Sequence, residues 1–136
     1  MCALFIDSNI FFYAKIMDRK YGQPCAEVIR KIEKVEIAAA TSVLIIAELA
    51  NALRKYGLDD EVKDVVDALF SLEITVLQVD STDMRNAINI FNDSRISPYD
   101  CVHIAVMEKA GIEEIISADR EFDKLPNIKR IDPHDL

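Results

Sequence analysis

Acidic side chains lie next to or inside apolar segments at four widely separated places in the chain. A carboxylate in such surroundings is costly to bury, so it needs a hydrogen-bond partner, a helix-cap role or a cation. The residues concerned are Asp7, Glu48, Asp100, and Asp119 with Asp123 four residues further on. If the fold brings them together, their oxygen atoms form the ligand set that a hard divalent cation prefers. The pattern therefore predicts a metal-dependent phosphoryl-transfer enzyme, with nuclease as the leading activity.

Two of these residues have an equally ordinary structural role. Asp7 follows an apolar pair and precedes Ser8, where a helix cap and a metal ligand are about equally reasonable. Asp100 lies three residues after Ser97 and follows Pro98, which matches a capping box with Asp in place of Glu. Both positions start a helix, and a carboxylate in the first turn can point toward a shared site.

The other acidic positions favour a ligand role more directly. Glu48 is the only charged residue between Thr41 and Arg54, inside an apolar helical segment. Its alternative is an ion pair with a neighbouring basic residue, but a hard cation offsets the desolvation of a carboxylate best. Asp119 and Asp123 are spaced so that one face of a helical turn presents both. The ligand interpretation is stronger for Asp119, which follows a predicted strand.

Several other polar residues border this pattern. His103 follows Asp100 by three residues, although a packing role is the favoured interpretation, and two histidines cannot build a His-based metal centre. Ser117 could donate a hydrogen bond to a neighbouring carboxylate or simply bind the backbone. Lys55 shares a helix face with Glu48 and could contribute to a basic rim, against the plainer interpretation of scattered surface charges. The other candidates for that rim are Arg54, Lys15, Arg19, Arg95 and Arg120.

The expected elements alternate in type along the chain. Strands are predicted at 3–6, 36–40, 74–79, 114–117 and 127–131, the last at a sheet edge. Helices are predicted at 9–17, 24–34, 59–71 and 81–92, from a cap at Thr41 or Ser42 to 56, from Pro98 to 110, and as a turn at 119–123. Ser81 or Thr82 and Ser97 are the other expected caps.

Strands separated by helical crossovers imply a parallel α/β sheet of four or five strands with helices on both faces. Ligands bind such sheets at the carboxyl ends of the strands. Asp7 and Asp119 each follow a predicted strand, so both should project from the same edge.

The composition sets further limits. The chain of 136 residues fits one domain, 1–136, and it has no apolar run near the ~20 residues that cross a membrane. The N-terminus does not resemble a signal peptide, so a cytoplasmic location without a membrane partner is expected. Three cysteines without paired spacing argue against a disulfide framework or a zinc site. The net charge of -8 argues against broad electrostatic binding of nucleic acid, although bound cations and a local basic rim would offset part of it.

In their order and spacing, four segments resemble the PIN-domain ribonucleases, and among them the small VapC-type toxins. The resemblance runs from Ala3 to about Ile131. The segments are Phe5-Ile6-Asp7-Ser8-Asn9, Ala47-Glu48-Leu49, Ser97-Pro98-Tyr99-Asp100-Cys101-Val102-His103-Ile104-Ala105, and Ser117-Ala118-Asp119-Arg120-Glu121-Phe122-Asp123.

The resemblance implies a three-layer α/β/α fold, an acidic pocket that binds Mg²⁺ or Mn²⁺, and metal-dependent endonucleolytic cleavage of RNA. The family's metal-binding and catalytic quartet matches Asp7, Glu48, Asp100 and Asp119. Asp123 matches a further acidic position that members use less regularly, and Asn9 and Ser117 match polar positions that support the carboxylates. Ser117 stands where many members have threonine. VapC-type members usually form homodimers and are inhibited by an antitoxin, so both are expected partners.

Three alternatives remain beside this interpretation. A non-catalytic or housekeeping PIN domain in RNA binding or RNA processing is the main one, and the intact acidic set argues against it. A phosphatase with Asp7 as nucleophile usually has a second Asp two residues on, where this chain has Asn9. A receiver domain needs an Asp at the end of a central strand and a late lysine after a strand, and neither is evident.

Overall fold

The structure is a computed structural model that describes residues 2–136. These residues form one five-stranded sheet in which every neighbouring pair of strands runs parallel. The strands are β1 (Ala3–Ile6), β2 (Ala38–Ser42), β3 (Ile74–Leu77), β4 (Glu114–Ile116) and β5 (Lys129–Ile131), in the spatial order β3-β2-β1-β4-β5. The predicted parallel α/β fold is confirmed, with β1 at the centre of the sheet and β5 at an edge.

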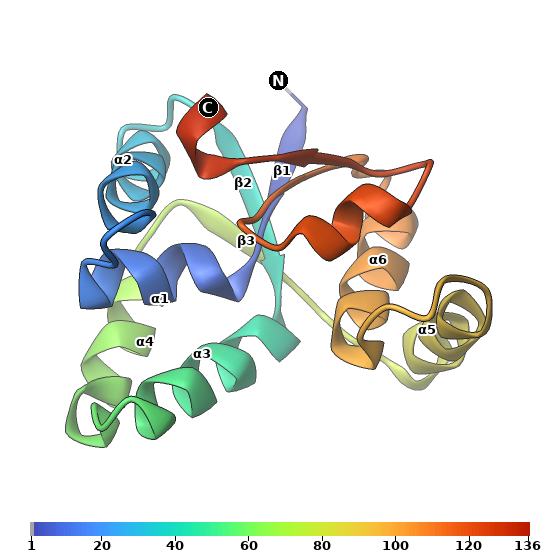
Figure 1. Cartoon of the computed structure of the whole chain (residues 1–136), viewed down its shortest axis with the longest axis horizontal. Helices are drawn as coiled ribbons and strands as arrows, with labels where there is room; N and C mark the ends of the chain where they lie inside the picture. Colours follow the sequence, from blue (N-terminus) through green and yellow to red (C-terminus); the bar gives the residue numbers. More distant parts are fainter. Residues whose placement is uncertain (1) are drawn as a thin grey trace.

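Helices lie on both sides of the sheet, with α1 to α4 on the left of Figure 1 and α5 and α6 on the right. They are α1 (Ser8–Ile16), α2 (Gly22–Glu33), α3 (Val43–Lys55), α4 (Val62–Phe70), α5 (Ser81–Ser94) and α6 (Pro98–Ala110). Short 3₁₀ helices occupy Asp59–Glu61, Arg120–Lys124 and Pro133–Asp135, so the first turn of the helix predicted over 59–71 is 3₁₀. Within residues 2–136, no helix has the length and apolar character needed to span a membrane.

The centre of the sheet is buried on both faces, as is usual for parallel sheets. The last two residues of β1 and the last two of β4 are fully buried and pair with each other. Asp7 and Ser117 directly follow these two pairs. The register therefore brings both polar residues to one edge, and the Asp7 backbone N–H donates to the Ile116 carbonyl over 3.1 Å.

Strand β2 runs two residues further than predicted, because Thr41 and Ser42 pair with the end of β3. The predicted capping hydrogen bond of α3 is wrong for this reason. Ser42 occupies the N-cap position, but its side chain makes no cap hydrogen bond. Thr41 Oγ1 instead donates to the Ile6 carbonyl over 2.9 Å in the buried interior. That hydroxyl links β2 to the end of β1, next to Asp7.

Helix α5 begins with Asp80 as its N-cap rather than with the predicted Ser81 or Thr82. Asp80 Oδ1 accepts from the Asp83 N–H and Asp83 Oδ2 accepts from the Asp80 N–H, each over 2.9 Å. This is a reciprocal capping box. The buried Asp83 carboxylate also accepts from Lys109 Nζ of α6 over 2.6 Å. Asp83 therefore both completes the capping box of α5 and ties this helix to α6.

Replacing Thr41 with Val should lower the free energy of unfolding by about 1–3 kcal/mol, the cost of leaving a buried polar group unpaired. The variant keeps the shape of the side chain but removes the donor to the Ile6 carbonyl. Chemical denaturation measures the difference. Thr75→Val, at an exposed position of β3, is the matched control and should change stability little. Equal losses in the two variants would contradict the role assigned to Thr41.

Candidate active site

Asp7 is held at the point where β1 ends and α1 begins. It is 4% exposed, and its Oδ1 accepts from the Ser8 backbone N–H over 2.8 Å as the N-cap of α1. The cap role and a ligand role are therefore compatible, because the cap uses only one carboxylate oxygen. Burial raises the pKa of the Asp7 carboxyl, although the neighbouring His103 and the Ser117 hydrogen bond work in the opposite direction.

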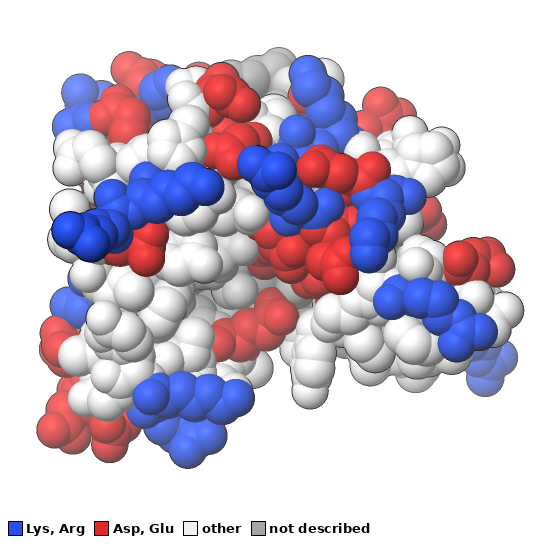
Figure 2. All heavy atoms as spheres, in the orientation of Figure 1, with Lys and Arg blue, Asp and Glu red and all other residues white. Residues whose placement is uncertain are grey.

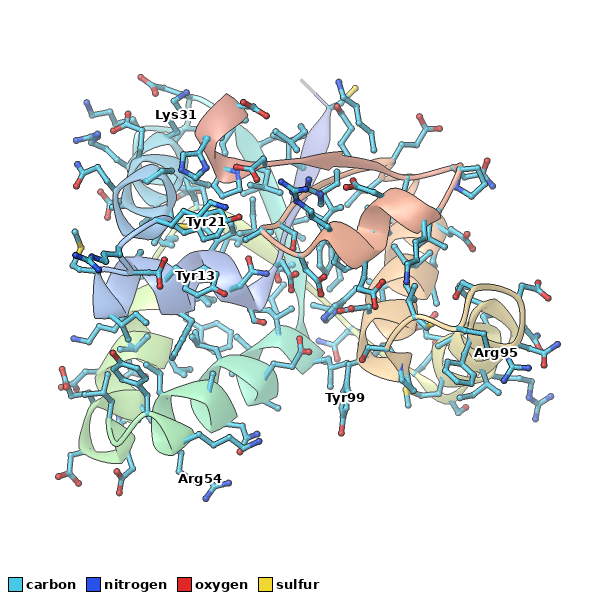
Figure 3. The ribbon with its side chains drawn as sticks, in the orientation of Figure 1. Tyr13, Tyr21, Lys31, Arg54, Arg95 and Tyr99 are labelled. Atoms are coloured by element: carbon cyan, nitrogen blue, oxygen red, sulfur yellow. The ribbon has the colours of Figure 1, made fainter. Side chains whose placement is uncertain are left out.

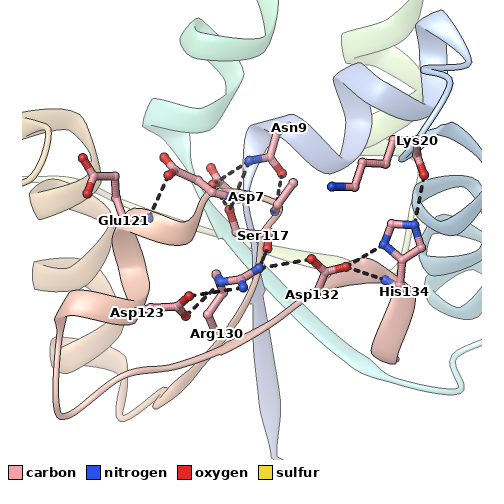
Figure 4. A network of polar contacts seen from close by, with 11 residues as sticks. Asp7, Asn9, Lys20, Ser117, Glu121, Asp123, Arg130, Asp132 and His134 are labelled. Carbon is pink, nitrogen blue, oxygen red and sulfur yellow. Dashed lines mark hydrogen bonds and ion pairs between the residues drawn. The ribbon is translucent and has the colours of Figure 1, made fainter.

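Two polar side chains fix the second oxygen of Asp7 (Figure 4). Ser117 Oγ donates to Asp7 Oδ2 over 2.6 Å, and Asn9 Nδ2 donates to the same oxygen over 3.2 Å. Asn9 also donates to Ser117 Oγ and accepts from the Ala118 N–H, so it spans the ends of β1 and β4. Ser117 Oγ further accepts from the Asp119 N–H over 3.0 Å. Both residues expected to support the carboxylates thus contact Asp7 directly.

Asp100 lies in the first turn of α6 and is 7% exposed. The capping box considered for it does not form, because Ser97 makes no side-chain cap hydrogen bond. Burial, followed by the negative charge of Asp7, raises the pKa of Asp100 to about 7, and the charges of Asp119 and Glu48 add to this. The fold therefore brings carboxylates from four separate elements within electrostatic reach of one another.

Glu48 of α3 meets the fully buried His103 of α6, whose Nε2 lies 2.7 Å from Glu48 Oε1. Burial lowers the pKa of His103, but the hydrogen bond and charge of Glu48, with the charges of Asp7 and Asp100, outweigh it and raise the pKa. His103 Nδ1 is buried and has no hydrogen-bond partner within residues 2–136. The ring packs against Phe5, with 5.4 Å between centroids. His103 is thus a core residue whose polar edge faces the acidic cluster.

Asp123 lies at an exposed position and is engaged elsewhere (Figure 4). Its carboxylate accepts from Arg130 Nε over 2.9 Å and from Nη2 over 3.3 Å. The largely buried Arg130 also donates through Nη1 to the Ser117 carbonyl over 2.9 Å and to Asp132 over 3.4 Å. This bidentate pair occupies both oxygens of Asp123 and fixes the backbone of Ser117.

The donor set fits a hard divalent cation. Ligand atoms of Asp7, Glu48 and His103 all lie within 4.8 Å of one another. Two further carboxylates, those of Asp100 and Asp119, lie nearby. The charges of Asp7, Asp119 and Glu48 all act to raise the pKa of Asp100. Cations such as Mg²⁺ and Mn²⁺ are bound in proteins by carboxylates and water, so these residues could hold one. The hydrogen bond between His103 and Glu48 gives the imidazole a supporting position behind a carboxylate.

Comparison with known proteins identifies the family. The sequence profile of the PIN domain matches residues 4–128. The chain belongs to the PIN-domain family. The profile runs from the second residue of β1 to the segment before β5, and therefore covers Asp7, Glu48, Asp100, Asp119 and Asp123.

Individual PIN-domain relatives are distant in sequence. Ribonuclease VapC13 of Mycobacterium tuberculosis is 24% identical over 129 residues, which cover 94% of this chain and 98% of the relative. The crystal structure of VapC20 from the same species, described as a sarcin–ricin loop cleaving toxin, has a TM-score of 0.76 at 16% identity and covers 93% of this chain and 97% of that chain. DNA-bound VapBC from Salmonella typhimurium has a TM-score of 0.72 at 19% identity, with 98% and 99% covered. These structures share the PIN fold with this chain.

Two contacts at the candidate site could not be predicted from the sequence, although the packing role expected for His103 is confirmed. His103 was favoured as a packing residue, and its contact with Glu48 joins residues 55 positions apart. The one available signal was its spacing from Asp100, which puts both on one face of α6. Arg130 gave no signal, because its contacts with Asp123 and Ser117 arise only when β5 pairs with β4.

In the metal-free protein, stability should fall as the pH rises from 5.5 to 8. Burial, followed by the charge of Asp7, raises the pKa of Asp100 in the folded state from its ordinary 3.8 to about 7. The folded protein therefore binds the proton more tightly, so this contribution to stability is present at low pH and is lost as the pH rises through about 7. Thermal unfolding in EDTA at both pH values measures the change.

Asp100→Asn should reduce this pH dependence and raise the melting temperature at pH 8, because the amide carries no charge to bury. The residual slope comes from Asp7 and His103, whose pKa values are also raised. An unchanged slope in Asp100→Asn would show that Asp100 is not the group responsible.

Proposed function

We propose that the chain is a divalent-metal-dependent endoribonuclease that hydrolyses RNA phosphodiester bonds. The proposed metal ligands are the carboxylates of Asp7, Glu48, Asp100 and Asp119, with Mg²⁺ or Mn²⁺ as the cation. The observation that supports the proposal is the gathering of these carboxylates near one sheet edge, where burial and the charges of Asp7, Asp119 and Glu48 raise the pKa of Asp100. Such repulsion is unfavourable in the empty protein and is relieved by a bound cation.

Neighbouring residues of the chain hold the proposed metal ligands in position. Ser117, Asn9 and the Ser8 N–H hold both oxygens of Asp7, so this carboxylate cannot rotate away when substrate enters. The hydrogen bond with His103 likewise holds the Glu48 carboxylate in position. A bound divalent cation would stabilise negative charge on the phosphate and promote ionisation of the attacking water. Asp123 is left out of the proposed ligand set because Arg130 occupies its carboxylate.

RNA as substrate and a toxin role follow from the relatives. The VapC13 relative is named a ribonuclease, and several structures of this fold are of VapBC pairs. We therefore include in the proposal the toxin role of a VapBC-type pair, an antitoxin partner and a homodimer. Residues 1–136 are proposed to form one PIN-like domain, since the profile spans 4–128 and the core cluster runs from Phe5 to Ile128.

The first test is cleavage of a mixed single-stranded RNA pool with Mn²⁺ or Mg²⁺, beside EDTA. Asp7→Asn should lower the cleavage rate by at least about 100-fold, the upper end of what even outer-shell residues of metal sites contribute. The variant should stay folded, because Asn is as good an N-cap as Asp and carries no buried charge. The matched control is Asp60→Asn, at an exposed position of the 3₁₀ turn before α4.

Each outcome decides between interpretations. Cleavage that requires metal and Asp7 supports the nuclease and its site. Full activity of Asp7→Asn contradicts the site. Absence of both cleavage and Mn²⁺ binding, measured by calorimetry, favours a non-catalytic PIN domain that binds RNA.

His103 is proposed as a positioning residue for Glu48. His103→Leu should weaken Mn²⁺ binding by about 10–100-fold, the range for residues that orient metal ligands. His103→Gln keeps a donor near the position of Nε2 and should restore part of the affinity. Titration calorimetry measures the affinity, and thermal unfolding measures the general cost of the core change.

A double variant separates positioning from packing. In a Glu48→Gln background, His103→Leu should cause no further loss of Mn²⁺ affinity if it acts through Glu48. Additive losses, or equal affinities for the Gln and Leu variants, would refute the positioning role.

A further inference from the structure

A groove of about 620 Å³ opens from the Glu48 side of the candidate active site. One wall is the face of α3 that presents Glu48, Asn51 and Lys55, residues three and four positions apart along the helix. Leu44, Ala47 and Ala52 of the same helix, Ser8 of α1 and Tyr99 of α6 complete the lining. Because Glu48 belongs to both the groove and the acidic cluster, a molecule in this groove adjoins the site of the proposed chemistry.

Tyr99 exposes more than half of its surface beside the groove. Its exposed fraction is 59%, and Figure 3 shows its ring extending from the start of α6 into open space beside α3. The residue lies between Pro98 and Asp100 in the first helical turn, so its backbone is fixed relative to a proposed metal ligand. An exposed ring in this position offers a π-face to a ligand in the groove.

Lys55 provides positive charge at the far end of the same groove. Its seven-residue separation from Glu48 is about 10 Å along the helix axis. It is exposed and forms no ion pair within residues 2–136, whereas the neighbouring Arg54 donates to Asn51 Oδ1 over 2.9 Å. Figure 2 shows acidic side chains at the centre of this face with basic side chains around them. In a chain of net charge -8, an unpaired lysine beside the acidic centre favours an anionic ligand.

We propose that this groove is a subsite for an unpaired nucleotide of the substrate RNA, with its base stacked on Tyr99 and a backbone phosphate at Lys55. The inference rests on the proposed ribonuclease function and adds which two residues receive a base and a phosphate next to the scissile bond. A base inside a duplex has both faces covered by its neighbours and cannot stack on a protein ring. The lining mixes polar side chains with Leu44, Ala47 and Ala52, and so offers no mainly apolar pocket of the kind that anchors a protein partner.

Kinetics on a single-stranded RNA oligonucleotide with Mg²⁺ or Mn²⁺ test the subsite. Tyr99→Ala should raise KM by roughly 5- to 100-fold, the range that base–aromatic stacking provides. Tyr99→Phe should keep most of the affinity, because the ring face is retained. The matched control is Tyr56→Ala, whose tyrosine has the same exposed fraction of 59% but packs on Phe12 outside the groove.

Substrates with a single abasic nucleotide at successive positions locate the stacked base. At one position, the missing base should weaken RNA binding by the wild type as much as Tyr99→Ala does. The same missing base should not weaken RNA binding by Tyr99→Ala any further. Lys55→Ala should reduce the slope of log binding constant against log salt concentration by about 1, the value for one lost phosphate contact. Lys34→Ala, at the exposed C-terminal end of α2, is its control.

The outcomes separate this inference from the proposed function. If the wild type cleaves RNA but Tyr99→Ala behaves like Tyr56→Ala, the nuclease stands and the subsite is refuted. If the wild type does not cleave, fluorescence anisotropy with the same labelled RNA still decides, since the subsite requires Tyr99-dependent binding of the single strand. The subsite is also refuted if the wild type binds duplex RNA as well as single-stranded RNA. It is likewise refuted if Tyr99→Ala loses binding of a protein partner but not of RNA.

Discussion

The rest of the structure depends on the burial of mutually repelling carboxylates at the carboxyl edge of a parallel sheet. The central strands end in fully buried apolar pairs, so the residue after each one emerges where β1 and β4 meet. Asp7 and Ser117 are those residues. The apolar packing that secures the strands thus also confines charge, and burial together with the charge of Asp7 raises the pKa of Asp100. A fold that keeps such an arrangement must compensate it with hydrogen bonds or with a cation.

The compensation differs between the two halves of the site. On the sheet side, Asp7 is held by backbone and side-chain donors, and Arg130 fixes Ser117 from behind through its carbonyl. On the helix side, the one hydrogen bond to the Glu48 carboxylate within residues 2–136 comes from His103, which reaches it from the core. The position of Asp7 is therefore fixed at the sheet edge, whereas the position of Glu48 depends on how α3 and α6 pack. The groove opens on this second side, between the same two helices.

The sequence predicted the order of strands and helices and the shared edge of Asp7 and Asp119, because both follow from local patterns and from the geometry of parallel sheets. It could not decide between two possible partners of one side chain. Thr41 or Ser42 was expected to cap α3; Ser42 takes the N-cap position, whereas continued strand pairing gives Thr41 the Ile6 carbonyl. Asp123 was considered as a ligand, yet β5 brings Arg130 to it. In each case the competitor comes from a distant segment, so no local pattern could reveal it.

The net charge of -8 seemed to oppose binding of RNA, but the arrangement of charge changes that conclusion. Exposed charges further apart than about 8–10 Å are largely screened at physiological salt, so an RNA strand responds to its immediate surroundings more than to the total. The acidic residues concentrate at the centre of one face, where a cation would neutralise them, and basic side chains lie around them. Lys55 and Tyr99 then offer a phosphate contact and a stacking face beside that centre. Affinity built in this way is local and requires an accessible base, which links the overall acidity of the chain to a preference for unpaired RNA.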